Sequence, residues 1–183
     1  EPSTNRVYLF DSTGGSDNAD WSLNASTVIH EATHQTAYNV GIHNRFAMCP
    51  RWLVEGLATM FEARGVWDSR SYQTQTDRVN QERLRDFRSY AKNRPDDSLA
   101  SFLASDSLFE SDPLAAYAQA WALSFYLCET RPRLYAKYLE LTGSRPNFSD
   151  YSAAERVADF KKVFGSDLRM LENQFLQYMK EVQ

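Results

Sequence analysis

Apolar side chains recur every three or four positions along most of this chain, the spacing that places them on one face of an α-helix. One stretch differs: Val7–Phe10 is rich in strand-forming residues, and a polar, glycine-containing loop follows it. Helices are predicted over residues 25–39, 50–64, 73–93, 113–130, 133–142, 152–164 and 167–182. The pattern therefore predicts a mainly α fold (α+β) with a small N-terminal β element.

The first two predicted helices have recognisable ends and faces. Asn24 or Ser26 can cap the first helix, and Gly41 lies just past its end. Pro50 suits the first position of the second helix, which ends before Gly65. The apolar stripes that we expect to face the core are Ile29, Ala32, Thr36 and Val40 in the first helix, and Leu53, Leu57, Met60 and Phe61 in the second. The segment 73–93 has few apolar positions, which predicts a helix lying on the surface.

Composition and charge narrow the class of protein. The 183 residues, of which 43% are hydrophobic, suffice for one globular domain, which we take to be residues 1–183. Twenty basic and 24 acidic residues are well mixed, so no basic stripe indicates nucleic acid. No apolar run is long enough to predict membrane insertion. The expected partner is a soluble molecule, a peptide or a protein, and no pattern indicates an oligomeric state.

The chain start and the cysteines bear on the compartment. The first residues lack the basic and apolar segments of a signal peptide, and the abrupt start suggests a fragment of a longer chain. Cys49 and Cys128 allow either one disulfide, worth about 2–4 kcal/mol, or two buried thiols, so they constrain the compartment only weakly. A secreted or periplasmic location is favoured.

The first predicted helix carries the sequence His30-Glu31-Ala32-Thr33-His34. Residues four apart lie on one helical face, so both imidazoles can point at one metal ion. A catalytic Zn²⁺ takes three protein ligands and keeps one position for water, and Glu31 can accept a proton from that water.

A third metal ligand has to come from elsewhere. The metzincin pattern does not continue, because Ala37 and Val40 occupy the positions that would need glycine and histidine. His43 lies beyond the helix end, so Glu55, in the second helix and away from its apolar stripe, is the better candidate. Antiparallel packing of the two helices would bring Glu55 opposite the histidine pair.

These motifs resemble those of a known family. His-Glu-x-x-His followed by Trp52-Leu53-Val54-Glu55-Gly56-Leu57-Ala58 is similar to the gluzincin zinc metallopeptidases, including the aminopeptidase N branch. With the later segments "YAQAWALSFYL" and "DFKKVFGSDLRMLENQF", the chain resembles most a peptidase-MA-like domain of largely uncharacterised bacterial proteins. The resemblance implies a gluzincin-like helical domain whose N-terminal sheet is small or truncated here.

The resemblance also implies roles for single residues. It makes His30, His34 and Glu55 the zinc ligands and Glu31 the general base and acid. Gluzincins often use a downstream tyrosine or histidine to stabilise the oxyanion, and Tyr117 is our candidate, with Tyr38, Tyr72 and His43 as alternatives; Tyr117 could equally be a core residue. Glu62 either orients a ligand histidine or is a solvated glutamate at the helix end.

Three functions follow as hypotheses. The first is a zinc-dependent endopeptidase; the Gly-x-Met-Glu-Asn segment with which aminopeptidase N relatives hold a substrate amine does not occur here, so an exopeptidase is not supported. The second is a catalytically inactive peptide- or protein-binding module on a peptidase fold, with or without a stabilising zinc ion. The third is a helical scaffold whose motif is accidental.

Overall fold

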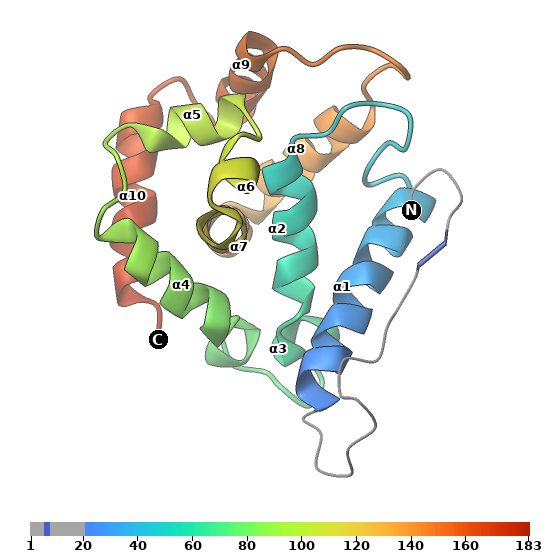
Figure 1. The fold of residues 1–183 in the computed structure, drawn as a ribbon, viewed down its shortest axis with the longest axis vertical. Helices are drawn as coiled ribbons and strands as arrows, with labels where there is room; N and C mark the ends of the chain where they lie inside the picture. The colour runs from blue at the N-terminus through green and yellow to red at the C-terminus, as the bar shows by residue number, and fades with distance from the viewer. Residues whose placement is uncertain (1–5, 8–20) are drawn as a thin grey trace.

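The computed structural model describes residues 6–7 and 21–183, and the expected mainly α architecture is confirmed for them. Their helices pack around one central helix, α7, seen nearly end-on in Figure 1. The elements are α1 (Trp21–Asn39), α2 (Arg51–Phe61), α3 (Arg64–Trp67), the 3-10 helix η1 (Thr76–Arg78), α4 (Gln81–Ala91), α5 (Ser98–Ala104), α6 (Leu108–Ser111), α7 (Pro113–Thr130), α8 (Pro132–Gly143), α9 (Ala153–Phe164) and α10 (Leu168–Glu181).

Helix α7 is buried almost all round because its sequence is apolar on every face. Its start is fixed locally: Asp112 caps the helix by accepting a hydrogen bond from the Ala115 amide at 3.2 Å, and Pro113 occupies the first turn. Helices α2, α4, α6, α8 and α10 surround it (Figure 1). An all-apolar helix of this length is stable in water only when neighbours cover it on every side, which makes α7 the centre of the core.

Helix α2 packs closely against α7. Gly56 lies at the contact, and a Cβ built on it would come within 2.2 Å of the Ser124 hydroxyl and 2.6 Å of the Ala120 carbonyl oxygen. Trp52 on the same helix is fully buried and stacks on Tyr138 of α8, with ring centroids 5.8 Å apart. These contacts fix the rotation of α2 and leave its other face towards α1, which lies beside it (Figure 1).

Several predictions for the outer elements are wrong or incomplete. The segment 73–93 is not one surface helix. The helical structure is interrupted after η1, and α4 begins directly after Asn80, whose side chain caps it. Leu84 and Phe87 of α4 are buried against the core. Two short helices, α5 and α6, were not predicted at all. The expected strand Val7–Phe10 falls largely outside the described residues, and no strand occurs among the described ones.

The predicted core face of α1 is also wrong. Ala32, Thr36 and Val40 are exposed, Val40 by 65%, whereas Ala37 is buried. The partly buried side chains of His30 and His34 instead turn towards α2. The histidines are therefore part of the helix contact itself.

Two further expectations concern the cysteines and the membrane. Cys49 and Cys128 are both free and partly buried, so the two-thiol alternative is confirmed and the disulfide is not formed. Across the described part of the chain, no helix combines the length and the apolar character that a bilayer-spanning segment needs.

Replacing Gly56 with alanine tests the contact between α2 and α7. We expect the free energy of unfolding to fall by about 1–3 kcal/mol, because the new methyl group meets a backbone carbonyl that cannot move away freely. Urea denaturation measures this change. The double variant Gly56→Ala/Ser124→Ala should recover only part of the loss, since Ala120 still obstructs the methyl group; a full recovery would show that the backbones are not in close contact.

Candidate metal centre

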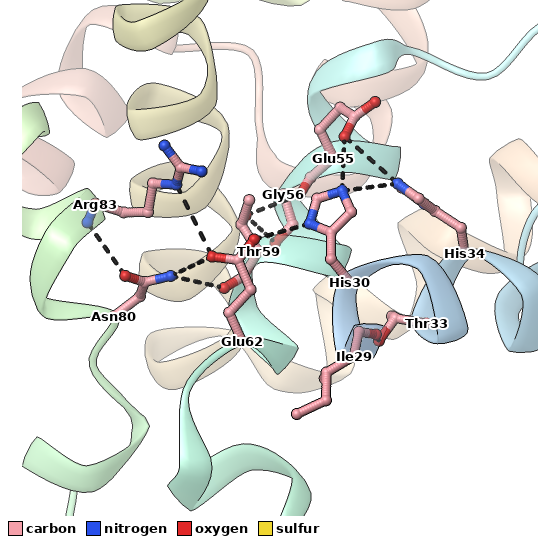
Figure 2. A network of polar contacts seen from close by, with 10 residues as sticks. All are labelled: Ile29, His30, Thr33, His34, Glu55, Gly56, Thr59, Glu62, Asn80 and Arg83. Atoms are coloured by element: carbon pink, nitrogen blue, oxygen red, sulfur yellow. Dashed lines mark hydrogen bonds and ion pairs between the residues drawn. The ribbon is translucent and has the colours of Figure 1, made fainter. Parts of the chain in front are cut away.

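Helices α1 and α2 bring three potential metal ligands together. His30 and His34 lie one turn apart on α1, and Glu55 faces them from α2 (Figure 2). The Nε2 atoms of the two histidines are 3.0 Å apart, and Glu55 Oε2 lies 3.3 Å from His30 Nε2 and 3.5 Å from His34 Nε2. Among the described residues, this is the group of His, Cys, Asp and Glu side chains whose ligand atoms converge closely enough to hold a metal ion.

The distances fit a tetrahedral ion. Two ligands at ~2.0–2.1 Å from a metal, at the tetrahedral angle, are separated by about 3.3 Å. The separations of 3.0, 3.3 and 3.5 Å bracket this value. Glu55 Oε2 is also buried without a hydrogen-bond partner, although it faces both rings. A buried carboxylate oxygen that makes no hydrogen bond is costly unless a cation satisfies it.

A second carboxylate orients the first histidine. His30 Nδ1 donates a hydrogen bond of 2.8 Å to Glu62 Oε1, and the other oxygen of Glu62 accepts one of 2.7 Å from the Asn80 side-chain amide (Figure 2). A proton held on Nδ1 leaves Nε2 as the atom with the free lone pair, directed at the point where His30, His34 and Glu55 converge; these three residues are called the triad below. The alternative of a solvated Glu62 is therefore wrong, because its side chain is only 14% exposed and both oxygens are bonded.

The electrostatics of the triad favour a charged Glu55 carboxylate and a protonated His30. Burial alone would raise the pKa of Glu55, but the nearby His30 and His34 lower it to about 2. Burial would lower the pKa of His30, yet the nearby carboxylates of Glu55 and Glu62 raise it to about 9. The site thus concentrates negative charge around one imidazole, and a proton and a metal cation compete for the same place.

The structure places Tyr117 beside this centre. It lies on α7, is half buried, and its ring centroid is 6.4 Å from that of His30. Burial and then the charge of Glu55 raise its pKa, so the phenol keeps its proton at neutral pH. Tyr117 lines a cleft of about 420 Å³ that also borders His30 and Glu62. Tyr117 therefore borders the cleft and also packs against the core.

The other predicted site residues are not among the converging ligand atoms. Glu31 is partly buried and directly follows the candidate ligand His30 on α1. His43 is almost fully buried, neither ring nitrogen has a hydrogen-bond partner, and burial lowers its pKa to about 4. It packs against Tyr38, with ring centroids 5.7 Å apart, but is not among the converging ligands. The Tyr72 hydroxyl accepts a hydrogen bond from Arg64.

Sequence reasoning missed Asn80 and Arg83. Asn80 donates hydrogen bonds to Glu62 and to the Thr59 carbonyl oxygen, and it also caps α4 through the Arg83 amide. Both residues were assigned to the interior of a long surface helix. The signal that could have located them is an asparagine three residues before Arg83, the arrangement of a helix N-cap.

Comparison with known proteins identifies the family. A family model described as a protein of unknown function, DUF1570, matches residues 24–149. The chain belongs to this family, and the matched region includes the triad, Glu31, Glu62, Asn80, Arg83 and Tyr117. No curated protein matches the chain. No solved structure matches it either.

The raised pKa of His30 predicts how stability depends on pH when the protein is kept in chelator. The folded pKa of about 9 lies above the unfolded value of 6.5, so the stabilisation is complete below pH 6.5 and is lost as the pH rises through 9. The loss should be on the order of 2–3 kcal/mol. Urea denaturation from pH 6 to 9.5 measures it.

Two controls separate His30 from other groups. His30→Gln should flatten the profile between pH 6.5 and 9, and an unchanged profile would contradict the assignment. His43 acts in another window, because its folded pKa of about 4 lies below the unfolded value. Its burial costs stability only as the pH falls from 6.5 towards 4.

Proposed function

We propose that this protein is a zinc-dependent metallopeptidase that hydrolyses internal peptide bonds. The observation that carries the proposal is the convergence of His30, His34 and Glu55 on one point at separations suited to a tetrahedral ion. Two histidines and one glutamate form a ligand set used by catalytic zinc, with a fourth position left for water or substrate. When bound, zinc supplies a Lewis acid that polarises a carbonyl group and lowers the pKa of water.

Glu31 is the proposed general base. It follows His30 directly in a helix, so its side chain is rotated by about 100° from the ligand face yet remains next to it. Its carboxylate would accept a proton from the attacking water and later deliver it to the leaving amine. The ligand carboxylate Glu55 cannot do this as well, because its low pKa makes it a weak base.

Tyr117 is the proposed oxyanion donor. Its phenol is half buried at the edge of the cleft, beside His30, and stays protonated at neutral pH. A protonated phenol can donate a hydrogen bond to the oxygen that becomes negative when the carbonyl is attacked. Helix α7 holds the residue from the centre of the core, which keeps its position fixed.

Glu31→Gln tests the base. The variant should bind zinc with wild-type stoichiometry, since no ligand changes, but should lose hydrolysis of an unfolded protein substrate by at least ~10²-fold, the usual contribution of a general base. Metal analysis and gel or peptide assays measure both properties. Glu110→Gln, an exposed glutamate on α6, is the control.

Different outcomes separate the candidate functions. Wild-type activity in Glu31→Gln would refute the mechanism. Stoichiometric zinc without any chelator-sensitive cleavage by the wild-type protein would favour a non-catalytic peptide-binding module. An absence of zinc, together with an absence of cleavage, would leave the motif as part of a helical scaffold.

Tyr117→Phe tests the oxyanion donor. We expect kcat to fall by about 10²–10³-fold with little change in KM, because the hydroxyl acts on charge that develops in the transition state. Steady-state kinetics on a cleaved peptide measure this split. Tyr126→Phe removes a hydroxyl from the same helix on a side away from the cleft, and it should leave both constants unchanged.

A further inference from the structure

Arg83 lies in the cleft beside the candidate metal centre and is not fully paired. Its side chain is only 22% exposed, and its Nε atom is buried without a hydrogen-bond partner. The nearest carboxylate oxygen, Oε2 of Glu62, is 3.9 Å from Nε, which is too far for a hydrogen bond (Figure 2). Among the described residues, the buried donor of Arg83 that lacks a partner is thus Nε–H.

Glu62 does not need Arg83 as a hydrogen-bond donor. One oxygen of Glu62 accepts from His30 Nδ1 at 2.8 Å and the other from Asn80 at 2.7 Å. A guanidinium group carries five N–H donors in a planar fork that matches the two oxygens of a carboxylate. The buried Nε–H donor of Arg83 therefore has no acceptor among the described residues and is left to an external one.

The surroundings hold the guanidinium group in place. Its Cζ atom lies 5.5 Å from the centre of the Tyr117 ring, a cation–π arrangement that limits its motion. The backbone amide of Arg83 is fixed by the Asn80 cap at the start of α4. Other charged groups lining the cleft are His30, Glu62 and the exposed Glu82. A guanidinium positioned in advance loses little entropy when it binds a ligand.

We infer that Arg83 binds a carboxylate of the substrate in this cleft of about 420 Å³, next to the metal centre. This inference deepens the proposed function and depends on it for the nature of the substrate. The substrate class is then a peptide with a carboxylate close to the cleaved bond, either on an Asp or Glu side chain or at a free C-terminus. Both sources present the same planar group to the guanidinium fork.

A simpler role for Arg83 is to balance the charge of Glu62. That role would place the guanidinium within hydrogen-bond distance of the carboxylate, as Arg78 lies 2.8 and 2.9 Å from the oxygens of Glu129 elsewhere in this protein. Arg83 keeps a distance of 3.9 Å instead. The contrast between these two arginine–glutamate pairs favours a ligand-binding role for Arg83.

A binding experiment tests the carboxylate site without requiring catalysis. The Nε–H resonance of Arg83 in ¹⁵N-labelled protein, assigned from the spectrum of Arg83→Gln, is followed during titration with three small probes. N-acetylglutamate α-amide carries only a side-chain carboxylate, N-acetylglutamine only an α-carboxylate, and N-acetylglutamine amide neither. A saturable shift with one or both charged probes and none with the neutral probe is expected, and the responding probe identifies the source.

A kinetic experiment tests the effect on substrate choice. A peptide that the zinc-loaded protein cleaves is compared with its Asp→Asn or Glu→Gln analogue and with its C-terminal amide. Arg83→Gln should reduce kcat/KM for the carboxylate peptide by about 10- to 100-fold, mainly through KM, and should change that of the neutral analogue little. Arg83→Lys should recover part of this loss, and Arg85→Gln, at an exposed position of the same helix, should have no effect.

The outcomes distinguish the carboxylate site from the peptidase activity. Equal losses on charged and neutral peptides, or loss of zinc from Arg83→Gln, would show that Arg83 only supports Glu62 and would overturn the inference. The same holds if no probe shifts the Arg83 resonance. If the wild-type protein cleaves no peptide but the charged probes bind at Arg83, the peptidase proposal fails while the carboxylate site stands.

Discussion

The close contact between α2 and α7 determines the geometry of the candidate centre. Gly56 lets the two backbones meet without an intervening side chain, and any Cβ there would collide with Ala120. This contact fixes the rotation of α2 about its axis. Glu55 and Glu62, seven residues and about two turns apart, consequently lie on the face that meets α1. A rotation large enough to relieve a larger side chain would carry both carboxylates away from His30. The position of the candidate ligand Glu55 therefore depends on a close contact made by the next residue of its helix, Gly56, with α7.

Once His30 has lost its proton, the centre does little for stability unless a metal cation is bound. Glu55, Glu62 and His30 are all less than 15% exposed, and burying two carboxylates beside one imidazole carries a large desolvation cost. Apolar residues at these positions would pack α1 against α2 more favourably. Locally unfavourable residue choices, which a substitution could make more stable, are expected at functional sites. The favourable packing lies elsewhere, around the wholly buried α7 and the aromatic cluster that includes Trp52.

The sequence predicted those parts of the protein that depend on local signals. Asp112-Pro113 marks the start of α7 because a cap and a first-turn proline act within one turn. The pairing of His30 with His34 follows from helical geometry alone, whereas the approach of Glu55 needed an assumption about how two helices pack. The predicted core face of α1 is wrong because apolar periodicity alone places residues such as Val40 inside, whereas the neighbouring helix decides which side is buried. Apolar periodicity predicts the buried face of a helix poorly where polar side chains, such as His30 and His34, make the contact with the neighbouring helix.

The break between η1 and α4 shows how a loop contributes to the centre. A continuous helix over 73–93 would have placed Asn80 in its interior, with its side chain free in solvent. Because α4 starts there, one asparagine side chain joins α4 to the end of α2. Its oxygen caps α4, and its amide group donates to Glu62 and to the carbonyl oxygen of Thr59 on α2. The orientation of His30 is thus linked through Glu62 to the start of the helix that carries Arg83. A shift of α4 would change the imidazole and the guanidinium together, so the ligand geometry and the charge in the cleft are set by the same few hydrogen bonds.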